Sequence, residues 1–192
     1  MTRNTVLGKA LLGYEALGAK AALVLAASFF VAIAAQITVP FFPVPMTLQT
    51  MAVLLVGATL GARMGTLALL AYVAEGAMGL PVFSKGGAGF AHLMGPSGGY
   101  IWGFVIAATL AGFAADRGLS RRLVTLIPAL MLANAALYLP GLVQLKLLTG
   151  AAWEQVWTWG AGPFLLGDLV KLVIVALIVT GGWKALSSRR QS

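Results

Sequence analysis

Long apolar runs with almost no charges limit what this chain can fold into. Only 9 % of its 192 residues are charged, whereas a soluble domain carries about 25 %. A surface with so few charges must face lipid, where a helix satisfies its own backbone hydrogen bonds. We therefore expect an all-α, polytopic membrane protein with six transmembrane helices, at 21–37, 48–60, 65–77, 100–115, 123–139 and 165–183.

The length suits one domain, which we place at residues 21–185. Residues 1–20 are polar with some helical spacing of leucines, so either a short amphipathic helix on the inner membrane face or a tail fits them. Small residues at 32–35 resemble a signal-peptidase site, but the polar stretch before them is long, so we expect the first helix to be retained. Residues 186–192 form a basic tail.

The basic residues predict the orientation in the membrane. With an inner N-terminus and six spans, all 13 lysines and arginines fall on the inner side except Lys85, Lys146 and Lys171. By the positive-inside rule both termini are then cytoplasmic. The net charge of +8 does not indicate nucleic-acid binding, because the charges sit at the ends of apolar runs and form no stripe.

Three unusual segments then meet on the outer side. They are a proline-rich segment at 38–47, a glycine-rich loop at 79–99 and the head of the last helix. Long loops in compact domains are often binding loops or lids. Non-helical backbone at membrane depth is tolerated only where it is buried in protein or lines a cavity. The sequence therefore predicts an outward-facing pocket.

Asp168 and Lys171 stand three residues apart at the head of the last apolar run, so they share a helix face. An ionisable residue inside such a run is a candidate functional residue. A carboxylate accepts hydrogen bonds and an ammonium donates them, which suits a ligand with adjacent N–H and C=O groups such as a cyclic urea. A structural ion pair that ties the helix to a neighbour is the alternative.

Other polar residues allow two interpretations each. Gln49 and Glu75 fit helix-end polar groups or ligand contacts, Tyr100 fits ring stacking or interfacial anchoring, and Asn134 is a polar group inside an apolar run. His92 is the only histidine and has no companion ligands at metal-binding spacing, so we expect no metal and no cofactor.

The chain lacks the motifs of common enzymes. Gly86-Gly87-Ala88-Gly89 is not followed by the Gly-Lys-Ser/Thr of a P-loop, so ATP-driven work needs another subunit. No Ser/His/Asp or Cys/His set is present, and we expect no enzymatic activity. Ala22, Ala26 and Phe30 lie one turn apart on the first helix, a spacing that allows close helix packing, either internally or against a partner.

Four motifs in series give a resemblance. Residues 42–49, 76–83, 95–100 and 167–171 resemble the BioY family of biotin transporters, which are substrate-binding (S) components of energy-coupling-factor (ECF) transporters. The resemblance implies a six-helix S-component fold with a biotin pocket near the outer surface. It also implies a place in the inner membrane of a bacterial or archaeal cell, and association with a membrane coupling subunit and two ATPase subunits.

The resemblance also implies residue roles. Asp168 and Lys171 would contact the ureido ring, the 79–100 loop would close the pocket, and the Ala22, Ala26 and Phe30 face would meet the coupling subunit. The candidate ligand-binding residues are thus Gln49, Gly86, Gly87, Gly98, Tyr100, Asp168 and Lys171. Some relatives carry a polar residue near Gly87 and an arginine where this chain has Ile101, and Lys85 or His92 could substitute there.

Four alternatives stay open. The cargo could be another small vitamin, or the chain could act as a stand-alone biotin permease, with homo-oligomers possible when it is alone. A membrane enzyme that uses Asp168, Lys171 and His92 is a third alternative. A structural subunit without a ligand, in which Asp168 and Lys171 only pair with each other, is the fourth.

Overall fold

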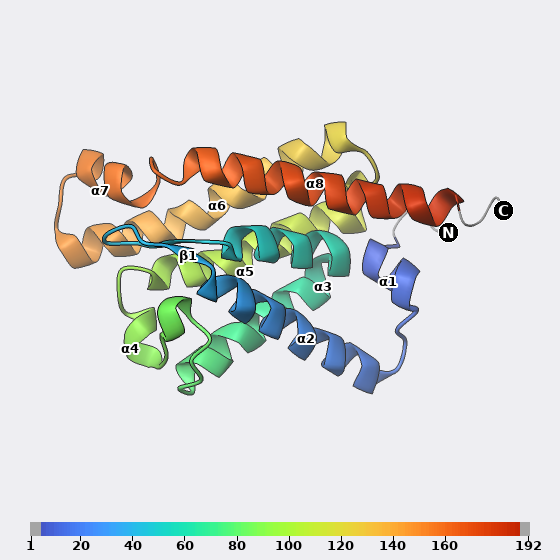
Figure 1. Ribbon diagram of the computed structural model, residues 1–192, viewed down its shortest axis with the longest axis horizontal. Coiled ribbons are helices and arrows are strands. Elements are labelled where there is room, and N and C mark those ends of the chain that lie inside the picture. Colours follow the sequence, from blue (N-terminus) through green and yellow to red (C-terminus); the bar gives the residue numbers. More distant parts are fainter. Residues whose placement is uncertain (1–4, 189–192) are drawn as a thin grey trace.

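The computed structural model describes residues 5–188 as a bundle of long helices (Figure 1). Residues 1–4, and Arg189 and Arg190 of the predicted basic tail, lie outside the described residues. Five helices in residues 5–188 are long and apolar enough to cross a membrane, which confirms a mostly helical polytopic fold: α2 (Leu17–Gln36), α3 (Gln49–Ala77), α5 (Gly98–Asp116), α6 (Leu123–Thr149) and α8 (Leu165–Ser188).

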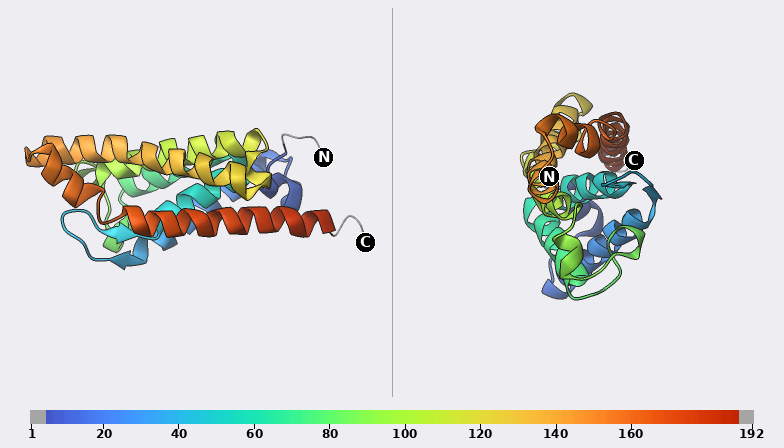
Figure 2. Two further views of the ribbon diagram at one scale, coloured as in Figure 1. Left: turned by 90° about the horizontal axis from the view of Figure 1, so that it is seen from above. Right: turned by 90° about the vertical axis from the view of Figure 1, so that its left-hand side faces the viewer.

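Shorter elements join and cover these helices. They are α1 (Leu7–Leu12), β1 (Thr38–Val39), β2 (Met46–Thr47), η1 (Ser84–Gly86), α4 (Phe90–Leu93), η2 (Leu119–Arg121) and α7 (Trp153–Gly160). The two strands pair antiparallel, with Thr38 opposite Thr47, and close the proline-rich segment into a small hairpin. Figure 2 shows α1 and the end of α8 at one end of the bundle, here called the α1 end, and α7 at the other, the α7 end.

The helix α3 reverses direction at Gly61. Gly61 adopts φ +82° and ψ 173°, which is outside the helical region and suits glycine. Gln49 Nε2 lies 2.8 Å from the Tyr72 hydroxyl, although 23 residues of straight helix would separate them by about 34 Å. α3 is therefore two antiparallel arms, 49–60 and 62–77, which Figure 1 shows turning back at the α1 end. The sequence predicted two separate spans here, joined by residues 61–64.

Asp116, at the end of α5, holds this turn. Its Oδ2 accepts a hydrogen bond from the Ala62 backbone N–H at 3.0 Å, and its Oδ1 occupies the place that a Cβ on Gly61 would need. Such a carboxylate at the start of the second arm satisfies a backbone donor that the helix itself leaves free. α1 packs against the same turn, since Val6 lies beside Gly61 and Gly8 beside Thr59.

Small residues let the helices approach closely. A Cβ on Gly57 would overlap the backbone of Ala108, and Ala107, Ala108 and Ala111 of α5 are fully buried. Lipid tails are as apolar as the core, so helix association in membranes depends on close packing of this kind. The packing of α3 against α5 sets the frame that positions the site.

The predicted end of the fifth span is wrong. The fifth span was expected to end at Leu139, before Pro140, but α6 continues through Pro140 to Thr149. Proline removes only one backbone hydrogen bond, and membrane helices tolerate it where neighbours compensate. The extra turns carry Gln144, whose amide donates to the carbonyls of Leu93 and Gly95.

Candidate ligand-binding site

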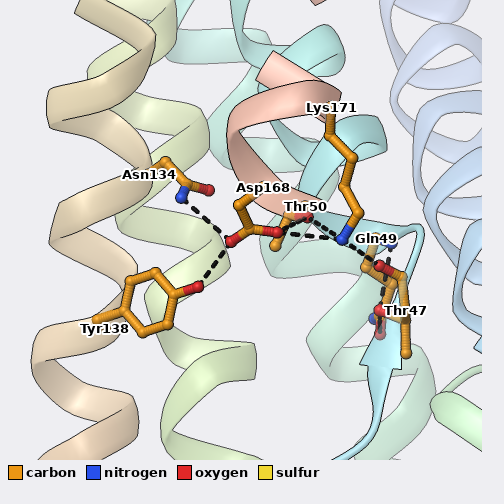
Figure 3. A network of polar contacts seen from close by, with 7 residues as sticks. All are labelled: Thr47, Gln49, Thr50, Asn134, Tyr138, Asp168 and Lys171. Carbon is orange, nitrogen blue, oxygen red and sulfur yellow. Dashed lines mark hydrogen bonds and ion pairs between the residues drawn. The ribbon is translucent and has the colours of Figure 1, made fainter. Parts of the chain in front are cut away.

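Asp168, in the first turn of α8, is the centre of a buried polar network (Figure 3). Its side chain is only 3 % exposed. Oδ1 accepts hydrogen bonds from Thr50 Oγ1 at 2.9 Å and from Lys171 Nζ at 3.0 Å. Oδ2 accepts from Tyr138 OH at 2.7 Å and from Asn134 Nδ2 at 3.1 Å. Four donors thus surround one carboxylate.

Lys171 lies one helical turn further along α8, and its side chain is 12 % exposed. Its ammonium donates to the Thr47 carbonyl at 2.8 Å, to Thr50 Oγ1 at 3.1 Å and to Asp168 Oδ1. An ammonium has three hydrogens, so all its donors are engaged. Asp168 and Lys171 therefore share one helix face, as predicted, and form a close ion pair within the helix bundle.

Four segments of the chain supply this network. Thr47 ends β2 and Thr50 lies in the first turn of α3, so the hairpin brings both to the start of α8. Asn134 and Tyr138 are one turn apart on α6, which places them on one face. A buried ion pair is tolerated when further hydrogen bonds satisfy its remaining donors and acceptors. The ion pair meets that requirement without a ligand, whereas Asn134 Oδ1 is buried without a hydrogen-bond partner among the described residues.

A cavity opens beside the pair. Its apolar wall is formed by Val44, Pro45, Met46, Tyr100, Ile101, Phe104, Leu137 and Phe164. Its polar residues are Thr47, Gln49, Thr50, Ser84, Ser97, Tyr138, Asp168 and Lys171. A cavity in which polar groups converge on an apolar wall is typical of small-molecule sites.

Two further predicted residues line the cavity. Gln49 Nε2 donates to the Tyr72 hydroxyl, and its Oε1 accepts from Thr47 Oγ1 at 2.8 Å. The Tyr100 hydroxyl donates to the Gly160 carbonyl at 2.8 Å and is buried, so this ring is held by α7 and not by the membrane interface.

Gly86, Gly87 and Gly98 lie near the cavity but are not among its lining residues. From the segment that contains them, Ser84 and Ser97 reach the cavity instead. A Cβ on Gly98 would overlap the Leu93 carbonyl, so this glycine allows close packing where α5 begins. A direct role of the three glycines in ligand binding stays a prediction.

The face predicted to meet a partner lies on α2. Ala22, Ala26 and Phe30 are all exposed, and Ala22 and Ala26 border a surface groove with the 12–16 linker. This groove is separate from the cavity beside Asp168, since the two share no lining residue. Contact with a coupling subunit stays a prediction.

Three residues of the network were not singled out from the sequence. Thr47 and Thr50 flank Gln49, and Tyr138 follows Asn134 by one turn. A polar residue one helical turn from another inside an apolar run is a signal that could have found Tyr138. The two threonines had no such signal, because their role depends on how the β1–β2 hairpin meets α8.

This architecture defines a polytopic membrane protein with a cavity beside a buried acid–amine pair. A sequence model of the BioY family matches residues 9–188. The chain belongs to the BioY family, a family of transporters and not of enzymes, as its four motifs indicated.

Relatives and a solved structure agree with this membership. The chain is 39 % identical over 146 residues to "Probable biotin transporter BioY" of Pyrococcus horikoshii, covering 76 % of this chain and 85 % of that protein. It is 36 % identical over 148 residues to "Biotin transporter BioY" of Thermotoga maritima, covering 77 % and 86 %. The crystal structure of the S-component for biotin from an ECF-type ABC transporter matches with TM-score 0.78 and 24 % identity over 89 % of this chain and 95 % of that one, which shows the same fold.

Proposed function

We propose that this protein captures biotin at the outer face of the cell membrane and acts in its uptake as the S component of an ECF transporter. The observation that carries the proposal is the Asp168–Lys171 pair beside a mostly apolar cavity, in a chain whose relatives are named biotin transporters.

The chemistry of the pair suits the ureido ring of biotin. A cyclic urea carries one carbonyl acceptor between two N–H donors, so Lys171 donates to the carbonyl and Asp168 accepts from an N–H. Both groups are fully hydrogen-bonded without a ligand, so biotin must replace existing contacts. The bonds of Lys171 to the Thr47 carbonyl and of Thr50 to Asp168 are the ones we expect to be exchanged.

The remaining contacts follow from the cavity wall. Tyr100, Phe104 and Phe164 offer aromatic surface to the fused rings and the aliphatic chain. Where some relatives have an arginine, Ile101 adds apolar surface here. Ser84 and Ser97 supply hydroxyls for the polar end of the ligand, and the loop that carries them closes the site.

The topology proposed from the sequence is compatible with the bundle. Counting the two arms of α3 separately gives six membrane segments, with both termini on the same side. Arg63 follows the Gly61 turn beside α1, Arg117 follows Asp116, and Arg121 stacks on Trp183 near the end of α8, so these arginines lie at the α1 end. Lys146 packs on Trp153 of α7, and Lys85 precedes Gly86, which bonds to Gln36 at the end of α2 away from α1. The positive-inside rule then makes the α1 end cytoplasmic and the cavity external.

We propose that energy comes from a partner module with one membrane coupling subunit and two ATPase subunits. The exposed face of α2 at Ala22, Ala26 and Phe30 is the proposed contact. A stand-alone biotin permease, as a monomer or homo-oligomer, is the alternative. Uptake of labelled biotin by cells that lack biotin synthesis, with and without the ATPase module, separates the two.

A ligand panel on the purified full-length protein tests the cargo. Biotin at 100 times its dissociation constant should stabilise the protein by about 2.7 kcal/mol. Desthiobiotin, which keeps the ureido ring, should also stabilise it, and vitamins without a cyclic urea should not. Stabilisation by another vitamin but not by biotin would contradict the proposed cargo.

A further inference from the structure

The motif at residues 76–83 has a packing role that the ligand contacts do not explain. Phe83 is fully buried, and its ring occupies the place where a Cβ on Gly76 would be. This ring packs edge-to-face with Tyr72 at a centroid distance of 5.5 Å and stacks on His92 at 5.0 Å. The loop between α3 and α5 is therefore anchored on the second arm of α3 through one aromatic ring.

The Tyr72 hydroxyl joins this loop to the cavity. Tyr72 is fully buried and does not line the cavity itself. Its hydroxyl donates to the Val82 carbonyl at 3.1 Å and accepts from Gln49 Nε2 at 2.8 Å. Gln49 in turn accepts from the hydroxyl of Thr47, whose carbonyl holds Lys171. One hydroxyl thus lies between the loop and the acid–amine pair.

Other ties of the loop do not reach the cavity. Gln36 of α2 donates to the Phe83 carbonyl and accepts from the Gly86 N–H, both at 3.0 Å. Gln144 of α6 donates to the Leu93 and Gly95 carbonyls. None of the loop groups that these two glutamines bind lines the cavity. Tyr72 differs because one of its two hydrogen-bond partners, Gln49, lines the cavity.

We propose that Tyr72 is a positioning residue that latches residues 79–97 over the cavity and fixes the orientation of Gln49, and so sets how long the ligand stays bound. The proposal rests on the proposed function for the identity of that ligand. Without the hydroxyl, the Gln49 amide and the Val82 carbonyl both lose a buried partner. The loop that brings Ser84 and Ser97 to the cavity then loosens together with a residue of the cavity wall.

Two measurements on Tyr72→Phe in the purified full-length protein test the latch. Amide hydrogen exchange should become faster in residues 82–89 and stay as in the wild type in α5 and α6. Dissociation of labelled biotin should become about tenfold to a hundredfold faster, as expected from leaving buried polar groups unpaired. Tyr14→Phe, the same change at a buried tyrosine of the α1 end, is the matched control and should alter neither.

A second variant, Phe83→Leu, removes the ring that both Tyr72 and His92 contact, and should also speed exchange in the loop. Unchanged loop exchange in Tyr72→Phe would overturn the latch, as would an increase spread evenly over the bundle. Hydrogen exchange needs no ligand, so it tests the latch even if the wild-type protein fails to bind biotin. That failure would instead contradict the proposed function.

Discussion

Two aspartates near opposite ends of the bundle show how the same side chain serves different purposes. Asp116, at the α1 end, is partly buried, and its carboxylate caps a backbone N–H at the Gly61 turn. Asp168, towards the α7 end, is almost fully buried, and its carboxylate accepts hydrogen bonds only from side chains. Asp168 also lines a cavity, whereas Asp116 does not line that cavity.

The difference lies in what each carboxylate can exchange. A backbone N–H at a helix start has no partner within its own helix. Asp116 therefore stabilises the turn and is not expected to exchange this hydrogen bond for one to a ligand. Side-chain donors such as Thr50 can rotate away when a ligand supplies a replacement. The surroundings of an acid in a membrane helix therefore distinguish a structural role from a binding role more clearly than burial does.

The largest expected effect is that of Asp168→Asn. The change leaves Lys171 as an unpaired buried charge, which should lower the free energy of unfolding by about 3–5 kcal/mol. Loss of a hydrogen bond to a charged group should also weaken biotin binding by about 1.5–3 kcal/mol, measured by isothermal titration calorimetry.

A double variant sharpens this result. Asp168→Asn with Lys171→Met removes both charges and should recover much of the lost stability, because no unpaired charge is left. It should not recover biotin binding. Recovery of both would mean that the pair is purely structural.

Asp116→Ala should give the opposite pattern. Loss of the cap at Ala62 should lower the free energy of unfolding by about 1–2 kcal/mol, measured by thermal or denaturant unfolding in detergent. Biotin affinity should stay at the wild-type value. A drop in biotin affinity as large as that of Asp168→Asn would contradict the assignment of a structural role to Asp116 and a binding role to Asp168.

Tyr138→Phe should have a smaller effect on binding. It removes one of the four donors to the Asp168 carboxylate, and the other three keep the side chain in place. A loss of about 1 kcal/mol, roughly fivefold in the dissociation constant, is expected from titration calorimetry. Tyr14→Phe is again the control, and an unchanged dissociation constant in Tyr138→Phe would mean that its hydroxyl does not tune the site.

The smallest effect concerns pH and the loop near the cavity. Burial lowers the pKa of His92 from its usual value near 6.5, and its Nε2 is buried without a hydrogen-bond partner. The Phe83 ring stacks on His92 and Gly87 lies beside it; neither residue carries a charge, and Lys85 of the same loop is exposed. The closed loop favours neutral His92. The contribution of His92 to the stability of the closed loop is therefore fully present above about pH 6.5 and decreases as the pH drops below that value.

Hydrogen exchange in residues 82–95, corrected for intrinsic rates, should therefore be faster at pH 5.5 than at pH 7.5. His92→Phe should abolish that difference. A pH dependence that persists in His92→Phe would assign it to another group.

Much of the fold was predictable from local patterns. Apolar runs predicted where helices lie, and Gly61 with its neighbours predicted the break in α3, because both depend on residues close in sequence. The shared face of Asp168 and Lys171 followed from helical spacing alone. The end of α6 could not be predicted from local patterns, because whether a helix continues through Pro140 depends on its packing partners.

The network around Asp168 could be predicted only in part. Thr50 lies 118 residues from Asp168 along the chain, and Asn134 and Tyr138 lie 34 and 30 residues away. Contacts over such separations depend on how the helices cross, which spacing does not encode. The glycine-rich loop was expected to supply Gly86, Gly87 and Gly98 to the site, but two serines of that loop line the cavity.

An experimental density map of the purified protein with bound biotin tests the central claim most directly. The account predicts the ureido carbonyl within hydrogen-bond distance of Lys171 Nζ and a ureido N–H on the Asp168 carboxylate, with the Thr47 or Thr50 contact of the pair exchanged. A map with biotin elsewhere, and with Asp168 and Lys171 still bonded as in Figure 3, would contradict it.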